Sequence, residues 1–286
     1  MKVDFVCETP WKLTPLGNPS DLQNRFFDNS RHFLIENASL RPKAKRAYHL
    51  GEVSYSDLNE FGFRCDNFDE ISKADKVFIF IGCSITFGLG IKKEDTWAYK
   101  MYEELKSKFP GQNVPFINLA FPASGIDFAI RNLRNFINRY NIKKVDGIFG
   151  LNINHRRFEV CFNKTLFLCI PPLGRRMFNP PEEDLMAKTE KMLANDAYLR
   201  QRLAEQLSSL KDIAKSVQCE SLLFGCFLQT ANEASFVTRV ANESGNDFCF
   251  GTWYDPIVKD FGDDLAHVGP ESHDAILSKM KEKLHS

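Results

Sequence analysis

The chain has 286 residues, of which 43% are hydrophobic and 26% charged, enough for one large domain with a buried core and an added extension. Its 37 Lys and Arg residues balance 37 Asp and Glu residues, so no net charge favours a nucleic-acid backbone or an anionic membrane as partner. No segment reaches the length of about 20 apolar residues that a membrane span needs, and the N-terminus lacks a signal-peptide pattern, so we expect a soluble cytoplasmic protein.

The eight cysteines include no C-x-x-C pair and lie mostly in apolar surroundings, which favours reduced thiols over zinc ligands or disulfides. Residues 1–70 contain several prolines and no helical period, so we predict an irregular N-terminal extension packed on a main domain of residues 71–286. Within the extension, residues 59–64 alternate Phe about Gly62, which predicts a short strand or bulge near the core. We expect Arg64 to be directed to solvent, with the site as the alternative.

From residue 76 onward, short apolar runs alternate with helical patterns, which is typical of β-α-β units. The expected strands cover residues 77–81, 115–119, 144–151, 221–227 and 248–250, and the expected helices cover 96–109, 126–140, 197–217 and 272–284. Residues 160–196 are the least regular, and their paired prolines indicate a lid or an insertion facing the substrate. The pattern predicts an α/β fold with a mainly parallel sheet of about five strands.

The first of these strands ends abruptly in Gly82-Cys83-Ser84, and ligands of open α/β sheets bind at this carboxyl edge. The residues that follow exclude three familiar motifs. A phosphate-binding loop needs Gly-Lys-Ser/Thr, a dinucleotide fingerprint needs G-x-G-x-x-G, and the α/β-hydrolase nucleophile elbow needs glycine where Thr86 stands. A Gly-x-Ser turn at a strand end is what remains, either as an ordinary turn or as a site.

Polar or small residues also follow the other strands: a turn at 123–125, Asn152, and the pair Asp264 and His267 before the last helix. A serine needs a base to take its proton at neutral pH, and an imidazole suits that work. A carboxylate can hold the imidazole in the right tautomer, while backbone N–H groups and an asparagine amide can bind an oxyanion. The alternative is structural: Ser84 and Asp264 as helix caps, and His267 as a surface residue.

In their order and separation, Gly82-Cys83-Ser84, the turn after Asn118, Gly150-Leu151-Asn152 and Asp264-Leu265-Ala266-His267 resemble the four blocks of the SGNH (GDSL-like) hydrolases over residues 76–284. The resemblance implies a three-layer α/β/α, flavodoxin-like fold. It also implies that Ser84 is the nucleophile, His267 the base and Asp264 its orienting carboxylate, with no metal or organic cofactor.

The blocks depart from the family's pattern at three places. Cys83 stands where Asp is usual, and we interpret it as a packed thiol. Ala123 stands at the usual glycine of the second block, so the oxyanion donors are Ser84, Asn152 and either Ala123 or Gly125. Ile153 follows Asn152 where Asp is usual, which leaves Asn154 as a fallback donor. The histidines at 49, 155 and 273 are expected to be structural or on the surface. The arginine pairs at 156–157 and 175–176 are expected to be solvated on the surface, with a contact to an anionic group as the alternative.

These residues predict a serine esterase, a carboxylic ester hydrolase that cleaves a short acyl ester, such as O-acetyl on a carbohydrate, through an acyl-enzyme on Ser84. The same chemistry fits an acyltransferase that passes the acyl group to a sugar hydroxyl. A third reading is a glycan-binding module that kept the fold and lost turnover. The expected partner is a small-molecule or carbohydrate ester, and the sequence leaves the oligomeric state open.

Overall fold

The computed structural model describes residues 58–59, 61–122, 124–152, 155–162, 165–169, 191, 195–262 and 267–286. Its centre is a five-stranded parallel sheet with the strand order β2-β1-β3-β6-β7. The strands are β1 (Phe78–Gly82), β2 (Phe116–Asn118), β3 (Gly147–Asn152), β6 (Ser221–Leu228) and β7 (Cys249–Trp253). This order is the flavodoxin-like arrangement, so the predicted sheet is confirmed.

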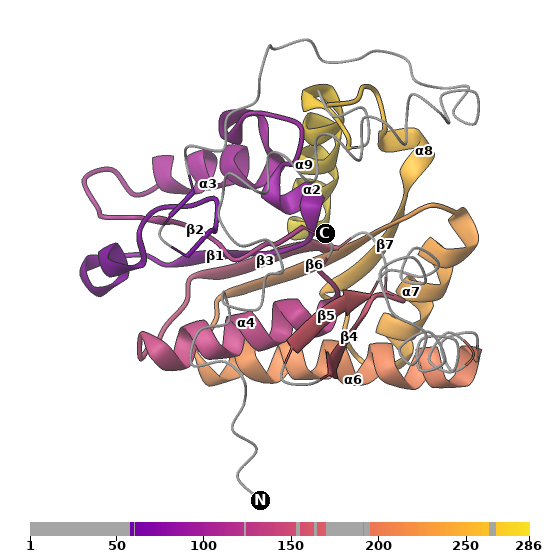
Figure 1. Ribbon diagram of the computed structural model, residues 1–286. Helices are drawn as coiled ribbons and strands as arrows, with labels where there is room; N and C mark the ends of the chain where they lie inside the picture. Colours follow the sequence, from indigo (N-terminus) through magenta and orange to yellow (C-terminus); the bar gives the residue numbers. More distant parts are fainter. Residues whose placement is uncertain are drawn as a thin grey trace, which may run out of the picture.

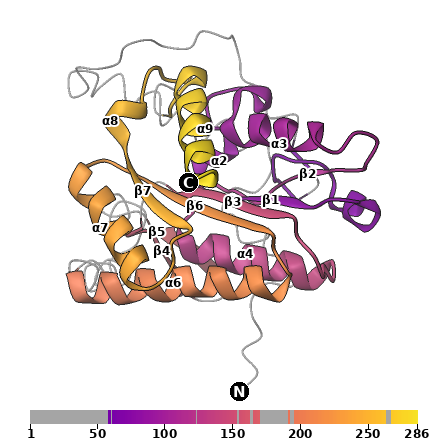
Figure 2. The same cartoon turned by 180° about the vertical axis from the view of Figure 1, so that it is seen from behind.

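Helices cover both faces of the sheet, which gives the predicted three layers (Figures 1 and 2). One face carries α3 (Trp97–Ser107) and α9 (Pro270–Leu284), and the other carries α4 (Ile126–Arg139), α6 (Asp196–Ser216) and α7 (Ala231–Glu243). Shorter elements are the helices α2 (Ser84–Phe87) and α8 (Tyr254–Ile257), the 3-10 segments η3 (Phe68–Lys73) and η4 (Lys93–Asp95), and the antiparallel hairpin of β4 (Phe158–Phe162) and β5 (Thr165–Cys169).

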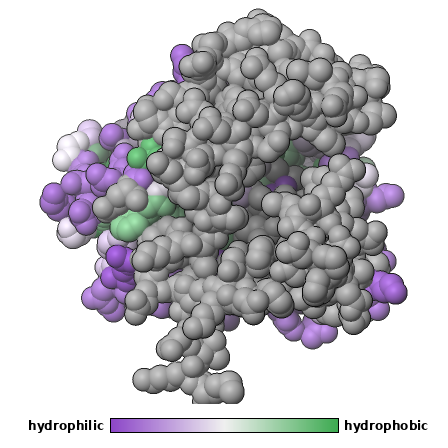
Figure 3. Space-filling view, in the orientation of Figure 1, coloured by the Kyte–Doolittle hydropathy of each residue, from purple (hydrophilic) through white to green (hydrophobic). Residues whose placement is uncertain are grey.

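The core forms because β1 is apolar on both of its faces and is buried along its whole length. On the α3 side, the ring of Phe80 contacts the rings of Trp97, Phe116 and Phe149 at centroid distances of 5.9, 5.6 and 5.7 Å. Such aromatic contacts join the helix layer to three neighbouring strands. In Figure 3, the described residues that are visible around the edge of the molecule are mostly hydrophilic, with a small hydrophobic area on the left. None of the helices in the described ranges is long and apolar enough to cross a membrane.

The end of the predicted N-terminal extension packs on the main domain through η3. Phe68 is fully buried, and its ring lies 4.8 Å from the ring of Phe136 in α4 and 5.7 Å from that of Tyr140. These contacts make the segment around Phe68 part of the core. Residues 1–57 and residue 60 lie outside the described part, so the domain boundary near residue 70 stays a prediction.

The strand or bulge predicted for residues 59–64 is wrong, because the described residues of this segment form a turn. The side-chain oxygen of Asn59 accepts hydrogen bonds from the backbone N–H groups of Phe61 and Phe63, each at 3.0 Å, and Gly62 between them has a φ of 81°. Asparagine favours turns through such bonds to nearby backbone groups. This local bonding outweighs the alternation of phenylalanines that suggested a strand.

Candidate active site

The turn after β1 requires glycine at position 82. Its φ is 146°, and a Cβ built there would lie 2.1 Å from the carbonyl oxygen of Leu151. The chain therefore turns sharply and begins α2 at Ser84, which is 3% exposed. No residue in the described part of the chain hydrogen-bonds to Ser84 Oγ, so its hydroxyl is not used as a helix cap within that part.

The segment after β2 lies against the same turn. Ser124 Oγ donates to the carbonyl oxygen of Gly82 at 2.8 Å, and the backbone N–H of Phe121 donates to it at 3.0 Å. Asn118 at the end of β2 donates through Nδ2 to the carbonyl oxygen of Thr86 at 3.0 Å. Gly125 is the N-cap of α4, and Ala123 lies outside the described residues. These bonds hold the second block beside Ser84.

The end of β3 is the third neighbour of this turn. In the parallel register Gly82 pairs with Leu151, so Asn152 follows directly and ends the strand with a fully buried side chain. Ile153 and Asn154, the alternative residue of this block, lie outside the described residues. Because the carboxyl ends of neighbouring parallel strands share one sheet edge, the first three predicted blocks meet there.

His267 lies just before α9, in a segment that packs near the loop after α2. Its carbonyl oxygen accepts from Gly262 N–H at 2.8 Å, and a Cβ built on Gly262 would lie 2.6 Å from the carbonyl oxygen of Gly90. Gly90 itself lies six residues after Ser84. The structure thus brings the C-terminal block to the region of the first block. Asp264 lies outside the described residues, and the roles of Ser84, His267 and Asp264 stay predictions.

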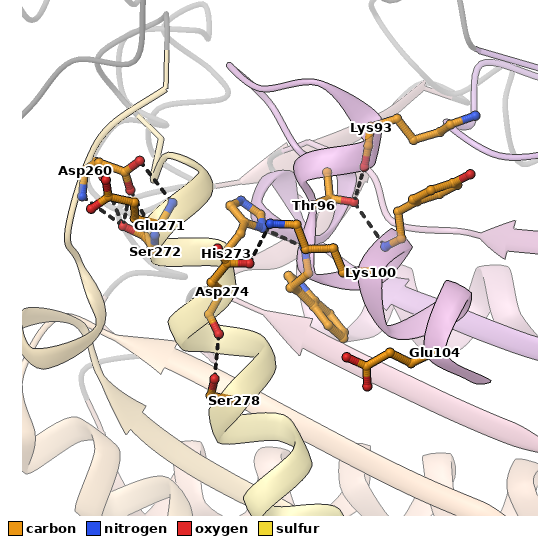
Figure 4. Close-up of polar contacts among 12 residues, drawn as sticks. Lys93, Thr96, Lys100, Glu104, Asp260, Glu271, Ser272, His273, Asp274 and Ser278 are labelled. Carbon is orange, nitrogen blue, oxygen red and sulfur yellow. Dashed lines mark hydrogen bonds and ion pairs between the residues drawn. The ribbon is translucent and has the colours of Figure 1, made fainter. Parts of the chain in front are cut away.

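Two polar contacts fix the start of α9, as Figure 4 shows. Nδ1 of His273 accepts a hydrogen bond from the backbone N–H of Trp97 in α3 at 3.0 Å, and the carboxylate of Asp260 accepts from the N–H of Ser272 at 2.9 Å and of Glu271 at 3.1 Å. Burial lowers the pKa of His273 to about 3. His273 is therefore neutral and structural, as predicted, and Asp260 caps α9.

Two arginines expected on the surface are buried at the site. Arg64 is 1% exposed and donates through Nη1 to the carbonyl oxygens of Gly88 at 2.7 Å and Ile91 at 2.9 Å, which fixes the loop after α2. Arg157 is 8% exposed and donates to the carbonyl oxygen of Ser124 at 3.3 Å. Both predictions of a solvated side chain are wrong, because backbone carbonyls in the interior satisfy the guanidinium groups. No motif marks either residue. Arg175 and Arg176 lie outside the described part.

Cys83 is buried, as predicted, and His155, expected to be structural or on the surface, is buried as well. The ring of His155 is 2% exposed and lies 5.4 Å from the ring of Phe236, and burial lowers its pKa to about 4. The thiol of Cys83 is fully buried and faces the carbonyl oxygen of Leu151 at 3.9 Å. His49 lies outside the described residues. Both described side chains have structural surroundings.

The sheet edge therefore offers a serine hydroxyl with backbone donors around it. The N–H of Ser84 is at the start of α2 and that of Gly125 is at the start of α4, where helix geometry leaves N–H groups without intrahelical partners. Such groups can stabilise an oxyanion. Within the described ranges, no cluster of three or more His, Cys, Asp or Glu residues could hold a metal ion.

No protein-family model matches the chain, and none of the curated proteins matches it either. Among solved structures, it is similar to TesA, with 12% identity and a TM-score of 0.43 over 73% of this chain and 98% of that one. An acetylxylan esterase from Geobacillus stearothermophilus, in a mutant form, matches with 12% identity and a TM-score of 0.44 over 74% and 95%. A member of the lipolytic protein G-D-S-L family from Veillonella parvula matches with 11% identity and a TM-score of 0.42 over 72% and 97%. Similarity at this level assigns no activity, which has to be argued from the residues of the chain itself.

Proposed function

We propose that the protein is a serine ester hydrolase of the SGNH type, with Ser84 as nucleophile, His267 as base and Asp264 as the carboxylate that orients His267. The observation that carries the proposal is the placement of Ser84. Ser84 is the first residue of a helix at the carboxyl edge of the sheet, and the second and third blocks adjoin it. Gly262, which donates to the carbonyl oxygen of His267, packs against the loop that follows Ser84.

In the proposed reaction, His267 takes the proton of Ser84 as Oγ attacks the acyl carbon. The negative charge that develops on the acyl oxygen is stabilised by the N–H of Ser84, a backbone N–H of the second block and the amide of Asn152. The C–O bond to the alcohol breaks, and His267 returns the proton to the leaving oxygen. A water molecule then repeats the sequence on the acyl-enzyme and frees Ser84.

The donor of the second block is Gly125 or Ala123 in this proposal. Gly125 is the better supported of the two, because it caps α4 without using its N–H in a backbone hydrogen bond to another described residue. Its turn is also held directly, since Ser124 Oγ donates to the carbonyl oxygen of Gly82. Removing one oxyanion donor typically slows turnover by about 10² to 10³.

The substrate we propose is an ester of a small acyl group, such as O-acetyl on a carbohydrate. The same acyl-enzyme would serve an acyltransferase if a sugar hydroxyl attacked in place of water. The second and third blocks differ from the family's pattern at Ala123 and Ile153. For this reason the alternative to an enzyme is a glycan-binding module without turnover.

The test is hydrolysis of p-nitrophenyl acetate by the wild type and Ser84→Ala, with Ser278→Ala on the exposed side of α9 as the matched serine control. Loss of the nucleophile should lower kcat by about 10⁴ or more, as in other triads, while the control keeps the wild-type rate. Equal rates in the wild type and Ser84→Ala would refute the proposal. Product analysis with an added sugar acceptor separates hydrolysis from acyl transfer.

A further inference from the structure

The guanidinium of Arg157 lies where the first and second blocks meet. Its Nη1 donates to the carbonyl oxygen of Ser124 at 3.3 Å, and the guanidinium interacts electrostatically with Cys83, the residue before the nucleophile. The backbone of Arg157 packs on Gly125, where a built Cβ would lie 2.9 Å from its carbonyl oxygen. Arg157 thus lies against the turn that carries Ser84 and against the Ser124-Gly125 turn.

The backbone of Arg157 is itself held in place by α6. Arg202 donates through Nη2 to the carbonyl oxygen of Arg157 at 2.8 Å and through Nη1 to that of His155 at 3.2 Å. Arg202 also pairs with Asp127 in the first turn of α4, and Gln206 donates to the same carboxylate at 2.7 Å. The base of the Arg157 side chain is therefore fixed to two helices, which leaves its guanidinium in a defined position.

Burial of the Arg157 guanidinium is energetically unfavourable by itself. Burial lowers the pKa of Arg157, and the interaction with Cys83 opposes that effect. No carboxylate in the described part of the chain forms an ion pair with Arg157, and its Nε is buried there without a hydrogen-bond partner. An arginine remains protonated in proteins, and an unpaired buried charge is unfavourable unless its hydrogen bonds offset it. Within the described part of the chain, the hydrogen bond to the carbonyl oxygen of Ser124 is thus the one that holds the guanidinium.

The residue at position 83 affects which hydrogen bonds the guanidinium of Arg157 can form. An aspartate there would form an ion pair with the guanidinium and compete for its donors, whereas the neutral thiol of Cys83 leaves a donor for the carbonyl oxygen of Ser124. The S–H of Cys83 faces the carbonyl oxygen of Leu151 at 3.9 Å. The presence of Cys83 in place of the family's usual Asp is therefore linked to the hydrogen bond between Arg157 and the carbonyl oxygen of Ser124.

We propose that Arg157 is a positioning residue that holds the Ser124-Gly125 turn in place and so keeps the Gly125 N–H directed at the oxyanion. The inference rests on the proposed function, since it assigns the donor of the second block. Arg157 would act through the N–H of Gly125, and the negative charge that this N–H stabilises develops only in the transition state. Loss of Arg157 should therefore lower kcat and leave KM nearly unchanged.

The experiment measures kcat and KM for p-nitrophenyl acetate in the wild type, Arg157→Met, Arg157→Lys and Arg157→Ala. Arg157→Met should lower kcat by about 10- to 100-fold, less than direct loss of a donor, with KM within about threefold. Arg157→Lys should recover part of the rate, because an ammonium can still donate to the carbonyl oxygen of Ser124. Arg239→Ala, an exposed arginine of α7, is the matched control and should keep the wild-type values.

Low millimolar guanidinium chloride should partly restore kcat in Arg157→Ala and leave the wild type and Arg239→Ala unchanged. A purely structural role would not give such rescue, and near-UV circular dichroism gives the folded fraction of each variant. The inference would be overturned if the Arg157 variants kept the wild-type kcat per folded molecule, or if guanidinium did not restore the kcat lost in Arg157→Ala. The proposed function would still stand in that case, provided that the wild type shows Ser84-dependent hydrolysis. Absence of Ser84-dependent hydrolysis in the wild type would overturn both.

Discussion

Gly262 packs directly against Gly90, with no room between them for a side chain. A Cβ built on Gly262 would lie 2.6 Å from the carbonyl oxygen of Gly90 and 3.1 Å from its Cα. The N–H of Gly262 also donates to the carbonyl oxygen of His267 at 2.8 Å. This contact joins the segment that carries the proposed base to the loop that follows the proposed nucleophile.

Gly262→Val should therefore separate the two segments. Overpacking at a buried contact typically costs about 1 to 3 kcal/mol of unfolding free energy, and a displaced His267 should lower kcat further than the loss of folded protein explains. Urea unfolding and kcat per folded molecule are the measurements. Gly245→Ala is the control: that glycine has a φ of 67° and open space around it at the end of α7, so its variant should lose stability and keep kcat. An unchanged kcat in Gly262→Val would contradict the role given to this contact.

Arg64→Met should destabilise the loop after α2. The substitution removes the donor that serves the carbonyl oxygens of Gly88 and Ile91 and leaves both acceptors buried, at a cost of about 1 to 3 kcal/mol. Chemical denaturation gives the change in unfolding free energy. Arg139→Met, on the outer side of α4, is the arginine control and should change stability by much less. Equal effects of the two substitutions would show that the buried bonds of Arg64 contribute nothing.

His155→Phe should flatten the acid side of the stability profile. Burial lowers the pKa of His155 to about 4 in the folded state, whereas an unfolded histidine titrates near 6.5. The unfolded state therefore binds more protons between these pH values, and folding free energy is lost as pH falls below about 6.5.

A phenylalanine at position 155 keeps the ring contact with Phe236 and removes this titration. Between pH 7 and pH 5 the variant should lose about 2 kcal/mol less stability than the wild type. The buried His273 contributes equally to the pH dependence of stability in both proteins, so the difference between their stability losses reports His155 alone. Urea unfolding at the two pH values is the measurement, and parallel losses in the two proteins would contradict the burial of this ring.

Asp260→Ala should weaken the start of α9. The carboxylate accepts from the N–H groups of Glu271 and Ser272, so its removal should cost about 0.5 to 2 kcal/mol, as for other helix N-caps. Asp274→Ala, on the exposed face of the same helix, is the matched control. Thermal unfolding compares the two variants. A smaller effect at Asp260 than at Asp274 would mean that the helix begins without this cap.

The sheet could be predicted because its strands are continuous apolar runs separated by helical patterns. The expected strand at 77–81 is β1, displaced by one residue, and the expected helix at 126–140 ends one residue later than α4. The prediction missed α7, although its buried residues Ala234, Val237, Val240 and Ala241 recur at helical spacing. The sequence therefore carried the periodic signal of this helix, and the prediction failed to use it.

The strand-end residues of the site could also be predicted, because Gly82 is required by its backbone conformation and Asn152 by its position at the end of β3. The supporting residues could not. Arg64 and Arg157 are buried by contacts with backbone carbonyls far along the chain, and a sequence does not reveal which carbonyls a folded chain leaves without partners. Long-range hydrogen bonds of this kind have no local pattern.

The most direct test of the account is covalent labelling by a fluorophosphonate, followed by peptide mass spectrometry of the wild type, His267→Asn and Ser84→Ala. The account predicts that one phosphonyl group attaches to Ser84 in the wild type and that His267→Asn, which cannot take up the proton, is labelled far more slowly. Ser84→Ala should remain unlabelled. Labelling at another residue, or equal labelling rates in the wild type and His267→Asn, would contradict the claim that these two residues act together.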